Sequence, residues 1–438
     1  MDLERHHHVN WKELFARRAF RYFFAALFVS IFGSGMNFAG VTWYILGRTN
    51  STVQVSFLLI LMTVPGLFVP FLGGVLIDRV DRRYLAITID LARGVVVMTT
   101  SALFFAQRGG PPQIYFMVVF LGVGSAIYWS TINALVQEVI PGGQLVAANS
   151  GVLIAVQGGL AISGAFVGFL YDHAGIAGIL AIDASTYFVS AFCLFRLRRG
   201  HFPARSHPAQ EGFEAPLAVA EETALLPLVE PTAESGLLVD LKEGARFLRN
   251  QPAVLALGLT YACMMAGVIS ANVLVVALVK DILNAGAFGY GLIESSWAIG
   301  AISGGLAVGL LVKRFRPATV LLAAMLTLSF GHALFPYAPF LILAAAMQAL
   351  FGACRAIGGI LTQSSIMFAV PRQLMGRTQS AFAVISTVLQ MAMSFSLGWL
   401  AERINLPFAF LALALLYGIA VVAAWRARPL AHAATPAD

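Results

Sequence analysis

The chain has 438 residues, of which 59% are hydrophobic and 11% are charged, and its mean hydropathy is +0.82. Soluble domains carry about 25% charged residues, so this composition excludes a soluble protein and indicates an integral membrane protein. The formal net charge of +7 could suggest a nucleic-acid partner, but the positions of the basic residues, described below, exclude that interpretation.

Motifs of several other function classes are absent from the sequence. The three cysteines, Cys193, Cys263 and Cys354, lie inside apolar runs and offer neither a disulfide framework nor metal-ligand spacing. No Gly-Lys-Ser or Gly-Lys-Thr occurs, so the chain carries no P-loop. The histidines at positions 6–8 have no acidic or cysteine partner at ligand spacing, which favours a solvated tail over a metal site. We therefore expect no enzyme activity, no cofactor and no metal.

Apolar runs predict twelve membrane-spanning helices, because one span needs about 20 apolar residues. Residues 1–19 form an N-terminal tail, six spans make a first half over residues 20–196, six more make a second half over residues 253–425, and residues 426–438 form a C-terminal tail. The predicted spans lie near 20–46, 53–77, 84–106, 113–139, 145–170, 175–196, 253–280, 288–312, 317–336, 339–369, 373–400 and 405–425.

Residues 197–252 form a polar linker between the two halves. From 198 to 235 this linker is rich in Pro, Ala and Glu, which is typical of a flexible segment. Residues 237–249 then place apolar and charged side chains at helical spacing, which predicts an amphipathic helix along the cytoplasmic face. A partner-binding role for the linker is the alternative.

Basic residues fix the expected orientation in the membrane. Of the 28 Lys and Arg residues, four lie on one side of it (Arg48, Arg108, Lys280 and Arg403), two lie within spans, and the other 22 lie on the side of both termini. Cytoplasmic loops retain the excess of Lys and Arg, so we expect both termini in the cytoplasm. The positive charge therefore reflects topology and not nucleic-acid binding.

The two halves also resemble each other. A gapless shift that places Pro141 on Pro371 also places Gly168 on Gly398. Two six-helix halves related by such a repeat are typical of secondary transporters.

A short charged turn at residues 73–83 joins the second and third spans. Its charges cannot lie in hydrocarbon, so the turn must lie at a water interface. The spacing from Gly74 to Asp78 and on to Arg82 resembles the loop between helices 2 and 3 of the major facilitator superfamily, with Asp81 in place of the usual glycine.

Further segments narrow this resemblance to the branch that includes macrolide-efflux proteins and the enterobactin exporter, and it covers residues 15–425. It implies an all-α membrane fold of twelve helices in two pseudo-symmetric halves. It also implies export of an amphipathic organic small molecule, such as a drug, macrolide or siderophore, by alternating access and proton antiport. The segments are Asp90-Leu-Ala-Arg93, Val139-Ile-Pro141, Ile182-Asp-Ala-Ser-Thr-Tyr-Phe188, Glu243-Gly-Ala-Arg-Phe-Leu248 and Val370-Pro371.

The expected partners are a small-molecule substrate, the proton as coupling ion and the lipid bilayer, and the expected location is a bacterial plasma (inner) membrane, as a monomer. Two alternatives stay open: uptake or facilitated transport of a metabolite by the same fold, and a non-transporting membrane sensor or scaffold. A sensor would more commonly carry a folded domain outside the membrane. Transport in everted vesicles distinguishes all three.

The same resemblance assigns a conformational latch. In the superfamily the loop and the inner end of helix 4 form a charge relay, which maps onto Asp78, Arg79, Arg82, Arg83 and Glu138. The alternative interpretation is that these charges only reflect the location of the loop on the cytoplasmic side of the membrane.

Charges inside spans are costly, so each one indicates a role. Arg355 lies on a face of small and polar residues, which indicates a substrate or coupling path, or else helix packing around a paired arginine. Glu294 is expected to be either the proton carrier or the ion-pair partner of Arg355. Asp90 can pair with Arg93 one turn away and is the next candidate for proton coupling. We interpret that pair, and Asp183, as structural.

Polar and aromatic faces of several spans predict a central cavity. Such side chains suit a bulky amphipathic ligand, because they offer contact area without demanding one hydrogen-bond pattern. The expected lining residues are Asn37, Trp129, Asn133, Tyr261, Met265, Asn272, Gln348, Arg355 and Gln390.

Overall fold

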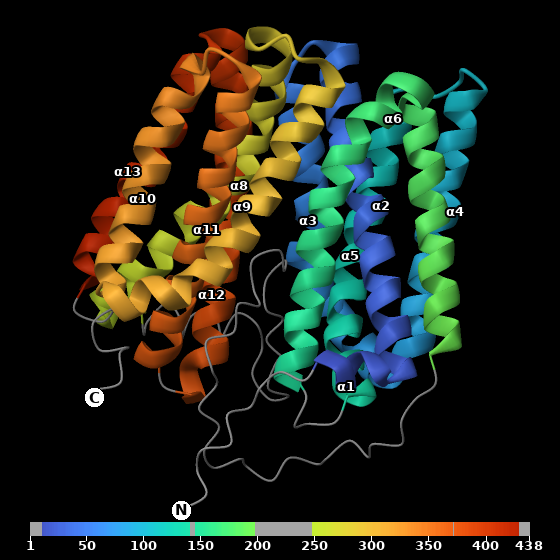
Figure 1. The fold of residues 1–438 in the computed structure, drawn as a ribbon, viewed down its shortest axis with the longest axis horizontal. Helices are drawn as coiled ribbons and strands as arrows, with labels where there is room; N and C mark the ends of the chain where they lie inside the picture. The colour runs from blue at the N-terminus through green and yellow to red at the C-terminus, as the bar shows by residue number, and fades with distance from the viewer. Residues whose placement is uncertain (1–10, 141–144, 198–247, 371, 429–438) are drawn as a thin grey trace, which may run out of the picture.

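The computed structural model describes residues 11–140, 145–197, 248–370 and 372–428, and every regular element in those ranges is a helix (Figure 1). Ten of the described helices are long and apolar enough to cross a membrane. The all-α membrane fold predicted from the sequence is therefore confirmed. Most of the linker, including the predicted amphipathic segment up to residue 247, and the C-terminal tail from residue 429 lie outside the described residues.

The N-terminal half contains the first six spans in five helices. Helix α6 holds two of them, because at Gly175 the backbone takes φ 61° and ψ −168°, which glycine adopts without a steric penalty. Figure 1 shows the two arms of α6 running antiparallel from this turn. The helices are α2 (Arg18–Thr49), α3 (Thr52–Arg79), α4 (Arg82–Phe105), α5 (Pro111–Val139) and α6 (Leu145–Arg196).

The C-terminal half contains six spans in six α-helices. Two of them, α8 and α10, begin with a proline, and α13 has Pro407 as its second residue. The fixed φ of proline suits the first turn of a helix, and its missing N–H is not needed there. With the two arms of α6 counted separately and the short helix α1 left out, the described α-helices make twelve. The elements are α8 (Pro252–Ala277) with the π-helical turn η2 (Leu278–Ile282), α9 (Gly286–Arg314), α10 (Pro317–Leu334) with η3 (Phe335–Tyr337), α11 (Leu341–Ala369), α12 (Arg372–Arg403) and α13 (Leu406–Arg426).

Asp81, which stands where the superfamily loop has glycine, caps helix α4. Its carboxylate accepts hydrogen bonds from the backbone N–H groups of Arg83 at 3.0 Å and Tyr84 at 3.3 Å. A side-chain acceptor at this position satisfies donors that the first turn of a helix leaves unpaired. The departure from the family pattern thus has a local structural role.

The tail predicted over residues 1–19 is partly folded in the structure. Residues Trp11–Ala16 form helix α1, and α2 begins already at Arg18. Leu14 is 1% exposed and belongs to the same core cluster as Phe20 and Phe23. The ring of Phe15 also packs edge-on against Phe20 and Phe24 of α2. These two apolar side chains anchor the short helix, which a count of polar residues did not reveal.

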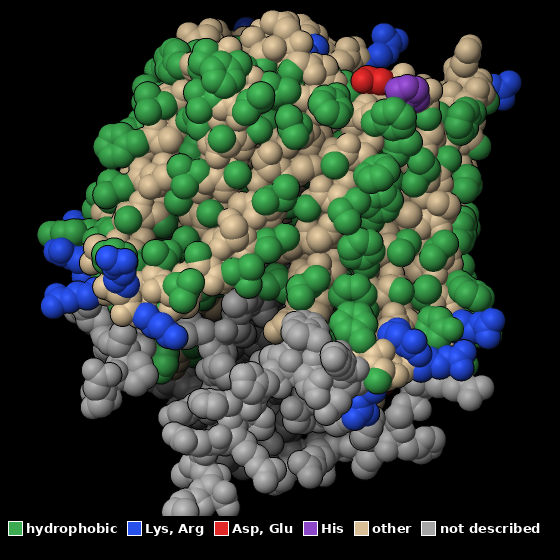
Figure 2. Space-filling model, viewed as in Figure 1, with side chains coloured by type: hydrophobic (Ala, Val, Ile, Leu, Met, Phe, Trp, Pro, Cys, Tyr) green, Lys and Arg blue, Asp and Glu red, His purple; other side chains and the backbone are tan. Residues whose placement is uncertain are grey.

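The outer surface of the bundle is apolar across its middle (Figure 2). Large side chains such as Phe116, Leu306 and Ile342 are about 70% exposed or more. An apolar surface this extensive is covered by lipid in a membrane protein, where the backbone is satisfied within each helix. On the face shown in Figure 2, Lys and Arg gather mainly at the end where the chain termini lie.

Candidate functional site

A cavity of about 190 Å³ lies between the two halves. Helices α2 and α6 line it from the N-terminal half, and α8, α9, α10, α11 and α13 line it from the C-terminal half. Aromatic rings from α2, α9, α11 and α13 supply contact area, while a small set of polar groups converges among them, as in sites for organic ligands. The polar side chains on this central cavity are Ser163, Asn272, Glu294, His332, Gln348 and Arg355.

The predicted cavity residues separate into three groups. Asn272, Gln348 and Arg355 line the central cavity, and Met265 contacts Arg355. Asn37 lines a smaller cavity inside the N-terminal half. The remaining four, Trp129, Asn133, Tyr261 and Gln390, line neither of these two cavities.

Glu294 is the acid of the central cavity. Its Oε1 is buried and has no hydrogen-bond partner among the described residues. Ion pairs within 4.0 Å in the described part of the chain join Arg82 to Glu138 and Arg93 to Asp90. The ion pair of Glu294 with Arg355, one of the two roles expected from the sequence, is therefore not formed in this structure.

Arg355 is 3% exposed and extends from α11 to the same cavity. Its Nη2 donates to the thioether sulfur of Met265 on α8 at 3.0 Å, a weak acceptor for a guanidinium. Glu294 and Arg355 thus offer opposite charges to one cavity without being bonded to each other.

His332 is a polar group of the cavity that the sequence reasoning missed. Its ring lies between Phe351 and Tyr417, with centroid distances of 4.3 and 5.0 Å. Nδ1 lies 2.7 Å from the carbonyl oxygen of Leu328, and a carbonyl only accepts, so Nδ1 carries a hydrogen. In the neutral ring Nε2 is then an acceptor. The signal was available, since an ionisable residue inside a span indicates a functional site.

Asp90 and Arg93 form the predicted pair on α4, and it is fully buried. The guanidinium of Arg93 lies 4.3 Å from the ring centroid of Tyr128 and 4.6 Å from that of Tyr187. The second carboxylate oxygen of Asp90 accepts from the hydroxyl of Ser190 at 2.6 Å. Asp90 lines neither of the two cavities, which fits a structural role better than proton coupling.

The latch residues lie at the end of the molecule that carries the termini. Arg82 Nη1 donates to Glu138 Oε1 at 2.9 Å, which joins the start of α4 to the end of α5. Arg83 donates from Nε to the carbonyl oxygen of Leu194 at 2.8 Å and so joins α4 to the end of α6. These contacts connect helices within one half. The side chains of Asp78 and Arg79 lie outside the described residues.

We expect Glu138→Gln to reduce transport about 5- to 150-fold while leaving substrate binding nearly unchanged. Its pair with Arg82 is about 30% exposed, so it contributes at most about 1 kcal/mol to folding. A bond that differs between transport states biases their equilibrium by its differential free energy, about 1–3 kcal/mol for coupled sites. Transport in vesicles and ligand binding to purified protein measure the two effects.

The control for this variant is Asp172→Asn, which removes an exposed carboxylate near the bend of α6. It should leave both quantities unchanged. Equal losses of binding and transport in Glu138→Gln, or a loss of expression alone, would indicate a folding role for the pair.

Contacts between the halves gather at the end opposite the termini (Figure 1). Thr52 Oγ1 on α3 donates to the carbonyl oxygen of Gly398 on α12 at 2.6 Å. One turn further along α3, Ser56 Oγ donates to the carbonyl oxygen of Ser394 at 2.7 Å. Lys280 Nζ reaches Asn50 Oδ1 at 2.8 Å across the same end. These bonds hold α2, α3, η2 and α12 together there.

Twelve helices in two halves, with a polar cavity between the halves, define a membrane transporter. A sequence profile of the Major Facilitator Superfamily matches residues 23–278, more than half of the chain. The chain belongs to this superfamily, and it is a transport protein and not an enzyme.

Relatives in sequence are exporters. The enterobactin exporter EntS of Salmonella paratyphi A is 26% identical over 363 residues, which cover 82% of this chain and 80% of that protein. The putative bacilysin exporter BacE of Bacillus subtilis is 29% identical over 155 residues, 35% of this chain and 38% of that protein.

Solved structures share the fold. The nucleoside transporter NupG is 14% identical, with a TM-score of 0.65 over 94% of this chain and 98% of that one. An inward-facing bacterial homologue of the lysosomal transporter Spinster is 15% identical, with a TM-score of 0.63 over 96% of this chain and 99% of that one.

Proposed function

We propose that this chain exports an amphipathic organic small molecule across a bacterial inner membrane, as a monomer, by alternating access and in exchange for protons. The observation that carries the proposal is the central cavity, where Glu294 and Arg355 meet an aromatic lining between the two halves. The sequence relatives, an enterobactin exporter and a putative bacilysin exporter, support the direction of transport.

Glu294 is the proposed proton carrier. A charge inside the membrane is costly unless it is paired or neutralised, and Glu294 forms no ion pair among the described residues. Substrate that engages Arg355, or a change in hydration of the cavity, would alter the stability of the ionised carboxylate. Glu294 would then take up a proton in one state and release it in the other.

Everted membrane vesicles test the proposal. With enterobactin and bacilysin as probes, we expect accumulation inside vesicles whose lumen is acidified, and loss of accumulation when a protonophore removes the gradient. Accumulation in intact cells instead would indicate uptake. No movement of either probe in either direction, with the protein folded and inserted, would favour a sensor or scaffold.

The proposed orientation makes a separate prediction. Lys313→Cys, at the end with the basic residues, should resist a membrane-impermeant maleimide in intact cells, whereas Arg108→Cys should react, since the positive side of a membrane protein faces the cytoplasm. Both native side chains are exposed in the structure. The background should lack the three native cysteines. Labelling of Lys313→Cys as fast as that of Arg108→Cys would contradict a cytoplasmic location of the termini.

A further inference from the structure

Two aspartates and one arginine lie fully buried between α2, α4, α5 and α6. Arg93 is bonded to Asp90, as described above. Asp183, on the second arm of α6, is 0% exposed. Its Oδ2 accepts from Asn37 Nδ2 on α2 at 2.5 Å, while its Oδ1 is buried and has no hydrogen-bond partner among the described residues. One cation therefore faces two carboxyl groups.

This cluster carries an excess negative charge whenever both acids are ionised. A buried charge without a compensating partner is strongly disfavoured in a membrane interior. Among the described residues that contact this cluster there is no second cation: Asn37 on α2 donates to the Asp183 carboxylate, Thr186 on α6 donates to the main-chain carbonyl oxygen of Asp183, and Tyr128 on α5 and Tyr187 on α6 contact Arg93. A proton on Oδ1 removes the excess charge and leaves Oδ2 as the acceptor for Asn37.

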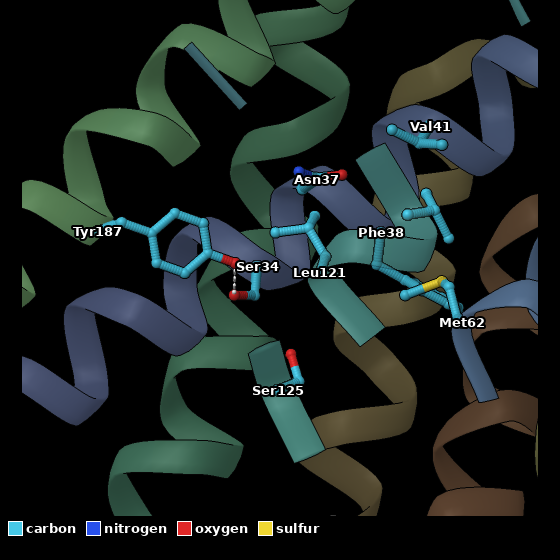
Figure 3. Close-up of a pocket in the computed structure, with 9 residues that line it drawn as sticks. Ser34, Asn37, Phe38, Val41, Met62, Leu121, Ser125 and Tyr187 are labelled. Carbon is cyan, nitrogen blue, oxygen red and sulfur yellow. Dashed lines mark hydrogen bonds between the residues drawn. The ribbon is translucent and has the colours of Figure 1, made fainter. Parts of the chain in front are cut away.

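A small cavity lies beside this site, on the far end of the contact from Asp183 to Asn37. It has a volume of about 50 Å³, and its polar lining consists of Ser34, Asn37, Ser125 and Tyr187 (Figure 3). A water molecule needs about 10–15 Å³ and two to four polar partners, so the cavity can hold water. Asn37 lines this cavity, and its Nδ2 donates to Asp183 Oδ2. Phe38 lines both this cavity and the central one, so the two adjoin.

We propose that Asp183 is a second proton-binding site of the transporter, and that it exchanges its proton with water in the small cavity beside Asn37. A role of Asp183 in the transport cycle rests on the proposed proton antiport. Such a role would place one bound proton in the N-terminal half, whereas Glu294 lies in the C-terminal half. Proton binding by Asp183 does not itself depend on export.

Infrared spectroscopy of the purified full-length protein, without substrate and at neutral pH, tests the site. Exposed aspartates are ionised under these conditions, so a protonated carboxyl band reports buried acids. With ¹³C in the side-chain carboxyl of aspartate, we expect part of this band to move to lower frequency. The moved part should vanish in Asp183→Asn and persist in the matched control Glu294→Gln. An unmoved band would overturn the proposal.

A second variant covers the case in which Asp183→Asn does not fold. Asn37→Ala removes the amide donor to Asp183 and should raise the frequency of its carbonyl, whereas a band from Asp90 would stay in place. No shift in Asn37→Ala would overturn the assignment. Loss of the band on adding NaCl at constant pH would also overturn it, because the site would then bind Na⁺.

Hydrogen–deuterium exchange tests the route. Ser125→Leu fills the small cavity, so we expect the moved band to exchange several-fold more slowly in D₂O than in the wild type; equal rates would overturn the route through this cavity. None of these measurements uses transport. Failure of the proposed function would appear separately, as an absence of substrate-linked proton release with the Asp183 band intact.

Discussion

Glu294→Gln is expected to abolish uphill, pH-driven export while keeping substrate binding and downhill exchange. Glutamine mimics the protonated acid, so the cavity keeps its shape and loses only the group that changes its charge. The aromatic rings and Arg355 on the cavity stay in place, and these supply most of the contact area for a ligand. The expected loss is therefore in coupling and not in affinity.

Proton release on substrate addition measures the coupling between substrate and proton directly. If enterobactin is transported as in the proposed function, adding it to weakly buffered, detergent-solubilised wild type should release protons, and the release should be absent in Glu294→Gln at equal occupancy. Asp172→Asn, which removes an exposed carboxylate, serves as the control and should behave as the wild type. If Glu294→Gln releases as many protons as the wild type, Glu294 is not the carrier, and Asp90 and Asp183 are the next acids to test.

Much of the fold follows from hydropathy, because each span must bury its backbone polar groups within one helix. The predicted spans near 145–170 and 175–196 are the two arms of α6, and Gly175 lies at the turn between them. The count of polar residues did not predict helix α1, where Leu14 and Phe15 pack against α2 despite their basic neighbours.

The central cavity was only partly predictable. Glu294 and Arg355 were identified because charges inside a span are costly, and the same logic applied to His332 would have found it. The sequence could not predict whether Glu294 and Arg355 are bonded to each other, because side-chain packing between helices decides this. In the structure Arg355 donates to Met265 on α8. The periodicity of one helix shows which face is polar, but not whether that face meets a cavity or a neighbouring helix. Trp129 and Gln390 illustrate this, since neither lines the two cavities.

The internal repeat has a structural counterpart at the contact between the halves. Gly168 on α6 and Gly398 on α12 coincide when the two halves are aligned. A Cβ on Gly168 would lie 2.2 Å from the Cα of Phe288 on α9. A Cβ on Gly398 would lie 2.1 Å from the Oγ of Ser56 on α3. The same position of the repeat therefore permits close approach of the opposite half on both sides of the molecule.

Gly398→Leu is expected to shift the protein towards the state that is open at the end opposite the termini, and to reduce export strongly. The new side chain would collide with Ser56 and with the carbonyl oxygen of Thr52, which a Cβ would approach to 2.8 Å. Overpacking costs about 1–3 kcal/mol where the contact persists. The same amount biases a conformational equilibrium by about 5- to 150-fold.

A cysteine at position 268 measures this shift between states. Val268 lines the central cavity, and Val268→Cys is introduced in a protein that lacks the native cysteines. In intact cells an impermeant maleimide should label this cysteine faster in the Gly398→Leu protein, since the opened end faces outside in the proposed orientation. Gly309→Leu is the matched control, because a Cβ there meets nothing within 4 Å. Equal labelling in the two proteins would show that the α3–α12 contact does not close the outer end. Faster labelling in Gly398→Leu alone would identify it as the contact that must open for the substrate to leave.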